Sequence, residues 1–172
     1  GGEPRTHCRP GERMKRNEIR LTDHFLLSEF EDKATGLVCI HPLLPLRLEQ
    51  LRIRLGVPLR ITSSCRTWPE HRRIYRQQYG ERWAEEISLG SRHLLCGPDE
   101  EDFQKYPVLM ERLGEMTYLP AKSNLTCCAA DVRRPEEVSS RTFELVARSL
   151  FDFVKPYPWG LHVDLRHTPL DK

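Results

Sequence analysis

Two histidines and one aspartate lie in short sequence motifs where strand ends or turns are expected. His93 lies in SRHL, Asp131 in AADV and His162 in LHVD. Two imidazoles and one carboxylate can bind a zinc ion and leave a fourth position open for water, as catalytic zinc sites do. Zinc in such a site acidifies water and polarises a carbonyl group. Because the chain holds 7 histidines and 25 acidic residues, residue types alone do not single out this trio.

The stretch WGLHVDLRH, residues 159–167, shows how one of these side chains would be positioned. Leu161, Val163 and Leu165 alternate with His162 and Asp164. Such alternation predicts a strand with one apolar and one polar face. The apolar face would anchor the strand to a core, and the polar face would present His162 and Asp164 to a site.

The other predicted elements are short. Leucines at helical spacing predict a helix over 43–55 that ends at Gly56. Strands are predicted at 59–62 and 129–135, and helical segments at 70–87 with a break near Gly80, within 106–116 and over 136–154. This order favours an α+β fold with a small antiparallel sheet flanked by helices. A strictly wound parallel βαβ fold is the alternative, but the chain has no glycine-rich phosphate loop to support it.

Length and composition indicate one globular domain. A chain of 172 residues suits a single domain, which we place at 14–172, with a flexible arm at 1–13. Apolar residues make up 38% and charged residues 30%, which excludes a disordered chain. The net charge of +2 and the dispersed arginines argue against a nucleic-acid partner. No apolar run is long enough for a membrane span, no secretory signal pattern is present, and we expect a monomer.

The six cysteines contain no CxxC pair, and Cys127 and Cys128 are adjacent. Without a secretion signal, free thiols are favoured. The alternative is a disulfide between Cys96 and Cys127 or Cys128. A thiol-based site formed by Cys127, Cys128 and His93 is a further reading, but no third group that would orient it can be named.

Five sequence motifs, taken in their order along the chain, resemble those of the zinc D-Ala-D-Ala peptidases, which have the Hedgehog/DD-peptidase fold. The words are HFLLSEFE (24–31), LRITSSCRTWPEH (59–71), SRHL (91–94), AADVRR (129–134) and GLHVDLR (160–166). The resemblance covers most of the chain after Met14 and is strongest with the short single-domain members of bacteria and phages. Five words in the same order are far more specific than any one of them.

The resemblance implies one zinc ion bound by His93, Asp131 and His162. It implies that Arg66 binds the carbonyl or terminal carboxylate of the substrate, a task that suits a planar guanidinium. Ser91 would support the site near the metal. Asp164 would either orient a metal ligand or take the proton from the zinc-bound water. For each of these polar residues, the alternative interpretation is an ordinary structural role.

The chain departs from the family pattern at two places. Asp131 follows His93 by 38 residues, far more than in the family, so an insertion lies at about residues 95–128. A long surface insertion is tolerated, and beside the metal it would form a lid or a specificity wall. Many relatives carry a glutamate three residues before the last histidine, where this chain has Trp159. The general base would then be Asp164, His167 or no residue, and Trp159 would line the substrate cleft.

The leading functional hypothesis is a zinc peptidase that hydrolyses D-Ala-containing bonds in the stem peptide of bacterial peptidoglycan, as a carboxypeptidase or an endopeptidase. The alternative is a non-catalytic zinc-containing binding module of the same fold. Such a substrate lies outside the bacterial membrane. We therefore leave open a periplasmic or extracellular protein and a phage endolysin released at lysis.

Overall fold

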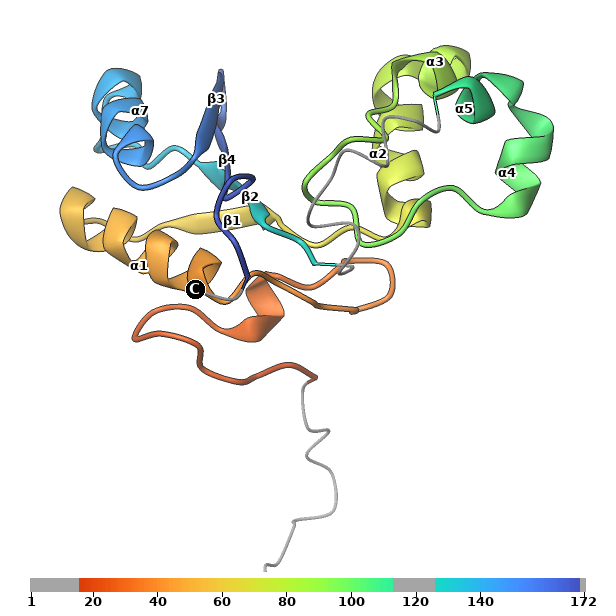
Figure 1. The fold of residues 1–172 in the computed structure, drawn as a ribbon. Coiled ribbons are helices and arrows are strands. Elements are labelled where there is room, and N and C mark those ends of the chain that lie inside the picture. The colour runs from red at the N-terminus through yellow and green to blue at the C-terminus, as the bar shows by residue number, and fades with distance from the viewer. Residues whose placement is uncertain (1–15, 113–125, 171–172) are drawn as a thin grey trace, which may run out of the picture.

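The computed structural model describes residues 16–112 and 126–170. Its centre is an antiparallel sheet of four strands in the order β1-β2-β4-β3, formed by β1 (Arg60–Ser63), β2 (Ala129–Arg133), β4 (Gly160–Asp164) and β3 (Phe153–Tyr157). Helices lie around this sheet (Figure 1). The predicted α+β class with a small antiparallel sheet is therefore confirmed. The arm at 1–13 and part of the predicted insertion lie outside the described residues.

The strand β3 corrects the prediction of a helix over 136–154. The helix α7 covers only Ser140–Arg148, with the Ser139 hydroxyl accepting a hydrogen bond from the Thr142 N–H at its start. Val154, assigned to the helix face, instead pairs with Val163 in the sheet. Pro156 and Pro158 favour extended backbone at Lys155 and Tyr157, the residues before them, and pairing with β4 continues the strand back to Phe153. Pro156 is tolerated in β3 because this is an edge strand of the sheet.

The main core lies between one face of the sheet and two helices. The helices are α1 (Leu43–Leu55) and α7, which lie on the same side of the sheet in Figure 1. Leu44, Leu48 and Leu51 are the fully buried leucines of the predicted stripe, and Phe143 packs in the same cluster. The helix ends at Gly56, whose φ of 69° is left-handed and suits glycine. This core gives the sheet a firm inner face.

A second apolar cluster lies on the other side of the molecule (Figure 1). It is formed around α2 (Trp68–Tyr79), the short helices η2 (Gly80–Arg82) and α3 (Trp83–Glu86), and the insertion helices α4 (Glu100–Lys105) and α5 (Pro107–Glu111). Trp68 and Trp83 lie at its centre with ring centroids 6.2 Å apart. Asp102 of α4 accepts a hydrogen bond from Trp68 Nε1 at 2.6 Å and pairs with Arg72. The described part of the insertion is thus packed against α2.

The segment that follows the short helix η1 (Leu27–Glu29) is hydrogen-bonded to the segment that follows β1. The first of these segments contains Asp32, which is fully buried. One Asp32 oxygen accepts from the Thr67 N–H at 2.7 Å, and the other accepts from the Thr35 N–H at 2.7 Å. These bonds hold the start of α2 and therefore the turn that carries Arg66. Within the described residues, no helix combines the length and the apolar character needed to cross a bilayer.

Candidate metal centre

The register of the two central strands places two of the predicted ligands side by side. Asp131 of β2 lies directly opposite His162 of β4. Directly opposed residues share one face of an antiparallel pair and have closely spaced side chains. Gly160 permits this register, because a Cβ at that position would lie only 2.1 Å from the Val132 carbonyl oxygen. The pair faces away from the core that Val132 and Val163 help to form.

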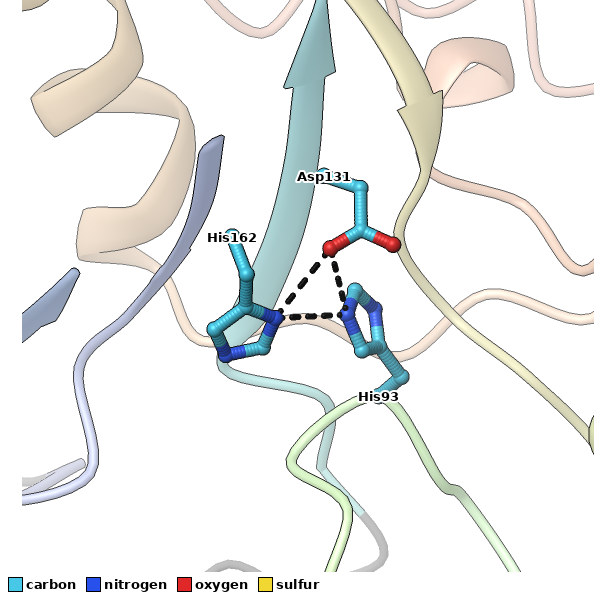
Figure 2. A group of neighbouring side chains, drawn as sticks. All are labelled: His93, Asp131 and His162. Atoms are coloured by element: carbon cyan, nitrogen blue, oxygen red, sulfur yellow. Dashed lines mark hydrogen bonds and ion pairs between the residues drawn. The ribbon is translucent and has the colours of Figure 1, made fainter. Parts of the chain in front are cut away.

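The third predicted ligand comes from a loop that is tied to the turn after β1. The Arg66 N–H donates to the His93 carbonyl at 2.8 Å, and the Leu95 N–H donates back to the Arg66 carbonyl at 2.8 Å. His93 is only 2% exposed. The backbone pairing brings its ring to the sheet face, where His93, Asp131 and His162 point toward one another (Figure 2).

Three side-chain atoms converge at this point. His93 Nε2 lies 3.0 Å from His162 Nδ1, and each nitrogen lies 3.1 Å from Asp131 Oδ1. Bonds of 2.0–2.1 Å from a tetrahedral zinc ion give ligand separations of about 3.3 Å. A zinc ion would therefore fit if the three donor atoms moved apart by a few tenths of an ångström. Within the described residues this cluster could hold a metal ion.

The protonation of both rings follows from their outer partners. His93 Nδ1 lies 2.7 Å from the Ser64 carbonyl oxygen, which can only accept, so this nitrogen carries the hydrogen. His162 Nε2 lies 2.9 Å from the ionised Asp164 carboxylate and must also donate. In the neutral rings, His93 Nε2 and His162 Nδ1 then have lone pairs and no hydrogen. Two nitrogen lone pairs and a carboxylate oxygen therefore face one another, an arrangement that a proton or a metal cation stabilises.

The charges of the cluster leave its ligands ready to bind a cation. Burial alone would raise the pKa of Asp131, but the charge on His93 and hydrogen bonds from both rings outweigh it and hold that pKa well below its usual range. Burial, together with the nearby Arg66 cation, lowers the pKa of His93. Burial would also lower the pKa of His162, but its bonds to Asp131 and Asp164 raise it. These shifts favour the neutral form of His93 and make His162 the more basic of the two rings, so a proton competes with a metal chiefly at His162.

Asp164 acts on the cluster from behind His162. Its carboxylate is fully buried and accepts hydrogen bonds from Arg166 Nε at 2.8 Å and from a terminal Arg166 nitrogen at 2.7 Å. Burial would raise the pKa of Asp164, but these bonds and the bond from His162 lower it to about 2. Of the two roles left open by the sequence, this geometry favours orienting the ligand. The carboxylate bonds to the outer nitrogen of His162, opposite the nitrogen that faces the cluster.

Arg66 contacts the cluster through the second oxygen of Asp131. A terminal nitrogen of Arg66 donates to Asp131 Oδ2 at 2.6 Å, and Nε donates to the Ser63 hydroxyl at 2.8 Å. Arg66 therefore forms an ion pair with Asp131, which is the structural alternative to a substrate-binding role. Arg66 holds the Asp131 carboxylate in place, and it is not among the residues that line the adjoining cavity.

A cavity of about 350 Å³ opens beside the three converging atoms. Ser91 lines it, and the Ser91 hydroxyl accepts from the His93 N–H at 3.4 Å. Trp159 does not line it and is 44% exposed at the β3–β4 turn. It stacks on Tyr157 instead, with ring centroids 5.1 Å apart. The aromatic residues that line the cavity are Tyr75, Phe153 and Tyr157, rather than Trp159.

Several lining residues carry no sequence signal of their own. They are Tyr75, Arg92, Phe153, Lys155 and Tyr157. Of the β3 residues, Phe153 fell in the helix expected over 136–154, whereas Lys155 and Tyr157 lie in the proline-containing segment after it. The adjacency of Arg92 to His93 was the one available clue. The cavity wall is therefore a product of the tertiary structure.

The cysteines do not form the predicted alternatives within the described residues. All five described cysteines are free, so Cys96 forms no disulfide with Cys127 or Cys128. Burial raises the pKa of the Cys127 thiol well above its usual value. Burial also raises the pKa of Cys128 to about 12. Because the thiolate is the reactive form, these two residues are poorly suited to a thiol-based site with His93.

Comparisons with protein-family models, curated proteins and solved structures find no match to this chain. The geometry of the cluster and the order of the sequence words are therefore the basis for assigning a function.

Metal affinity at this site is expected to fall as the solution becomes acidic. Because the pKa of His162 is raised above its ordinary value of 6.5, protons compete with the metal from a pH above that value downward. Zinc affinity should fall about tenfold per pH unit below the pKa of His162. Competition with a chromophoric chelator between about pH 8 and about pH 5 measures this. An affinity that does not change over this range would contradict the assignment of His162 as a ligand.

Proposed function

We propose that this chain is a zinc-dependent peptidase of the D-Ala-D-Ala type that hydrolyses D-Ala-containing bonds in bacterial peptidoglycan. The observation that carries the proposal is the convergence of His93 Nε2, His162 Nδ1 and Asp131 Oδ1 beside an open cavity. The five sequence words of this peptidase family, in order, supply the substrate class. The α+β architecture with its small antiparallel sheet is compatible with the Hedgehog/DD-peptidase fold.

The residues around the cluster support a metal of the zinc type. Nitrogen and carboxylate donors suit zinc, and each histidine has an outer partner that fixes its ring. Three protein ligands leave a fourth position open, and zinc bound there supplies the Lewis acidity that polarises a carbonyl and acidifies water. His93 is fixed by the Ser64 carbonyl, His162 by Asp164, and Asp131 by Arg66. The cavity beside them would receive the peptide.

One observation favours a second candidate, a zinc-containing binding module without catalysis. Within the described residues, Asp131 is the only carboxylate that lines the cavity, and it belongs to the cluster. Asp164 is engaged behind His162, and His167 is exposed and does not line the cavity. None of these residues is therefore placed to accept a proton as a glutamate does in many members of the peptidase family.

One experiment separates the two candidates. The purified full-length protein is loaded with zinc, its metal content is measured, and purified peptidoglycan is digested with mass-spectrometric readout. We expect one zinc per chain and release of D-alanine or cleavage of cross-links, both abolished by a chelator and restored by added zinc. One bound zinc without cleavage would select the binding module. A protein that binds no zinc would overturn both candidates.

A further inference from the structure

The wall of the cavity carries an excess of positive charge. Three cations line it, Arg92, Lys155 and Arg166, against the single carboxylate of Asp131. Asp131 is already engaged by both histidines and by Arg66. No other acidic residue in the described part of the chain lines the cavity.

Arg166 is the one of these cations whose charge is matched. It donates twice to the buried Asp164 carboxylate, and its guanidinium lies over the Phe153 ring at 3.6 Å from the centroid. Its charge is therefore neutralised, and its planar face is covered. Arg166 forms a structural part of the wall.

Arg92 and Lys155 lack such partners. Neither makes an ion pair with any residue in the described ranges, 16–112 and 126–170. One terminal nitrogen of Arg92 is buried without a hydrogen-bond partner. The Lys155 ammonium lies 5.3 Å from the centroid of the Tyr157 ring, a contact that leaves its charge uncompensated. A buried donor of a charged group without an acceptor is costly, so an incoming anion would be stabilised here.

Both cations lie next to the metal ligands. Arg92 precedes His93 in the chain, and Lys155 of β3 lies directly opposite His162 of β4. They therefore approach the cluster from the loop on one side and the edge strand on the other. An anion bound by them would lie beside the cluster within the same cavity.

We propose that Arg92 and Lys155 form an anion subsite that selects ligands carrying a carboxylate close to the bond presented to the metal centre. A guanidinium matches a carboxylate through two parallel hydrogen bonds, and an ammonium adds a point charge. The carboxylate is that of a chain end or of a side chain. This inference deepens the proposed function, on which it rests for the choice of peptide ligands.

The test measures binding, so it does not depend on turnover. Three peptides are titrated by calorimetry into the metal-free full-length protein: N-acetyl-D-alanyl-D-alanine, its C-terminal amide, and an amide-capped N-acetyl-D-alanyl-D-glutamate. The free acid or the glutamate peptide should bind about tenfold or more tightly than the neutral amide. Which of the two binds identifies whether the carboxylate comes from a chain end or from a side chain.

Variants assign the preference to the two cations. Arg92→Gln and Lys155→Gln should each reduce the preference for the charged peptide about tenfold. The control Arg47→Gln removes one half-buried positive charge from α1, where Arg47 does not line the cavity, and should leave the preference unchanged. Lys155 is exposed, so its variant tests the subsite even if the Arg92 variant fails to fold.

The possible results separate this inference from the proposed function. Equal binding of neutral and charged peptides, the absence of any binding, or an unchanged preference in the Lys155 variant would overturn the subsite. Zinc binding without peptidoglycan cleavage would overturn the enzymatic proposal and leave the subsite standing. Peptidoglycan cleavage without a carboxylate preference would overturn the subsite and leave the enzymatic proposal standing.

Discussion

His162→Ala is expected to lower the zinc affinity of the protein by more than about a hundredfold, because loss of a residue that only supports a ligand already costs 10–100-fold. The substitution removes one of the three converging donor atoms, His162 Nδ1. It also leaves the buried Asp164 carboxylate without its histidine partner. Competition with a chromophoric chelator gives the affinity, and elemental analysis gives the stoichiometry.

The thermal stability of the same variant gives an independent readout. Zinc that binds only the folded state stabilises it by about 2.7 kcal/mol at a free concentration of a hundred times the Kd. Added zinc should therefore raise the melting temperature of the unmodified protein and have little effect on His162→Ala. The control is His167→Ala, which removes an exposed histidine that follows the same strand. Retention of one tightly bound zinc by His162→Ala would refute the proposed centre.

Asp164→Asn is expected to weaken zinc binding by about 10–100-fold while leaving all three ligands in place. An amide is neutral and its nitrogen cannot accept a hydrogen bond, so it stabilises the donated hydrogen of His162 Nε2 less well and holds the tautomer with the Nδ1 lone pair toward the cluster less firmly. It also leaves Arg166 without a charged partner, since both Arg166 contacts are to this carboxylate. We expect a loss of about 1–3 kcal/mol in the free energy of unfolding.

The matched control for this prediction is Glu144→Gln on α7. Glu144 also pairs with an arginine, Arg148, at 2.7 Å, but this pair lies on the surface of α7. Surface pairs contribute between about 0 and 1 kcal/mol, so this variant should keep both stability and zinc affinity. Denaturant unfolding and chelator competition measure the two quantities. If Asp164→Asn bound zinc as tightly as the unmodified protein, the orienting role would be wrong.

Local pattern was sufficient for the elements with a clear periodicity. Leu44, Leu48 and Leu51 of α1 are buried as their helical spacing predicts. Leu161 and Val163 of β4, and Leu165 just after it, are buried as the alternation predicts. The helix expected over 136–154 was wrong at its end because the apolar residues Leu150, Phe151, Phe153 and Val154 have a spacing that suits either a helix or a strand. There the prolines and the partner strand β4 decide the conformation.

The sequence by itself determined which residue types were available and which face of β4 would carry them, because side-chain direction in a strand depends only on its period of two. His93, Asp131 and His162 could be named from their words, although His93 and Asp131 are 38 residues apart. Only the tertiary structure decided which atoms meet. The β2–β4 register opposes Asp131 to His162, and the backbone pairing of Arg66 with the loop brings His93 to them. The same long-range contacts assigned Arg66 to Asp131, Asp164 to His162 and the cavity wall to Tyr157 rather than Trp159. Distances between segments far apart in the chain depend on packing and register, which no local pattern specifies.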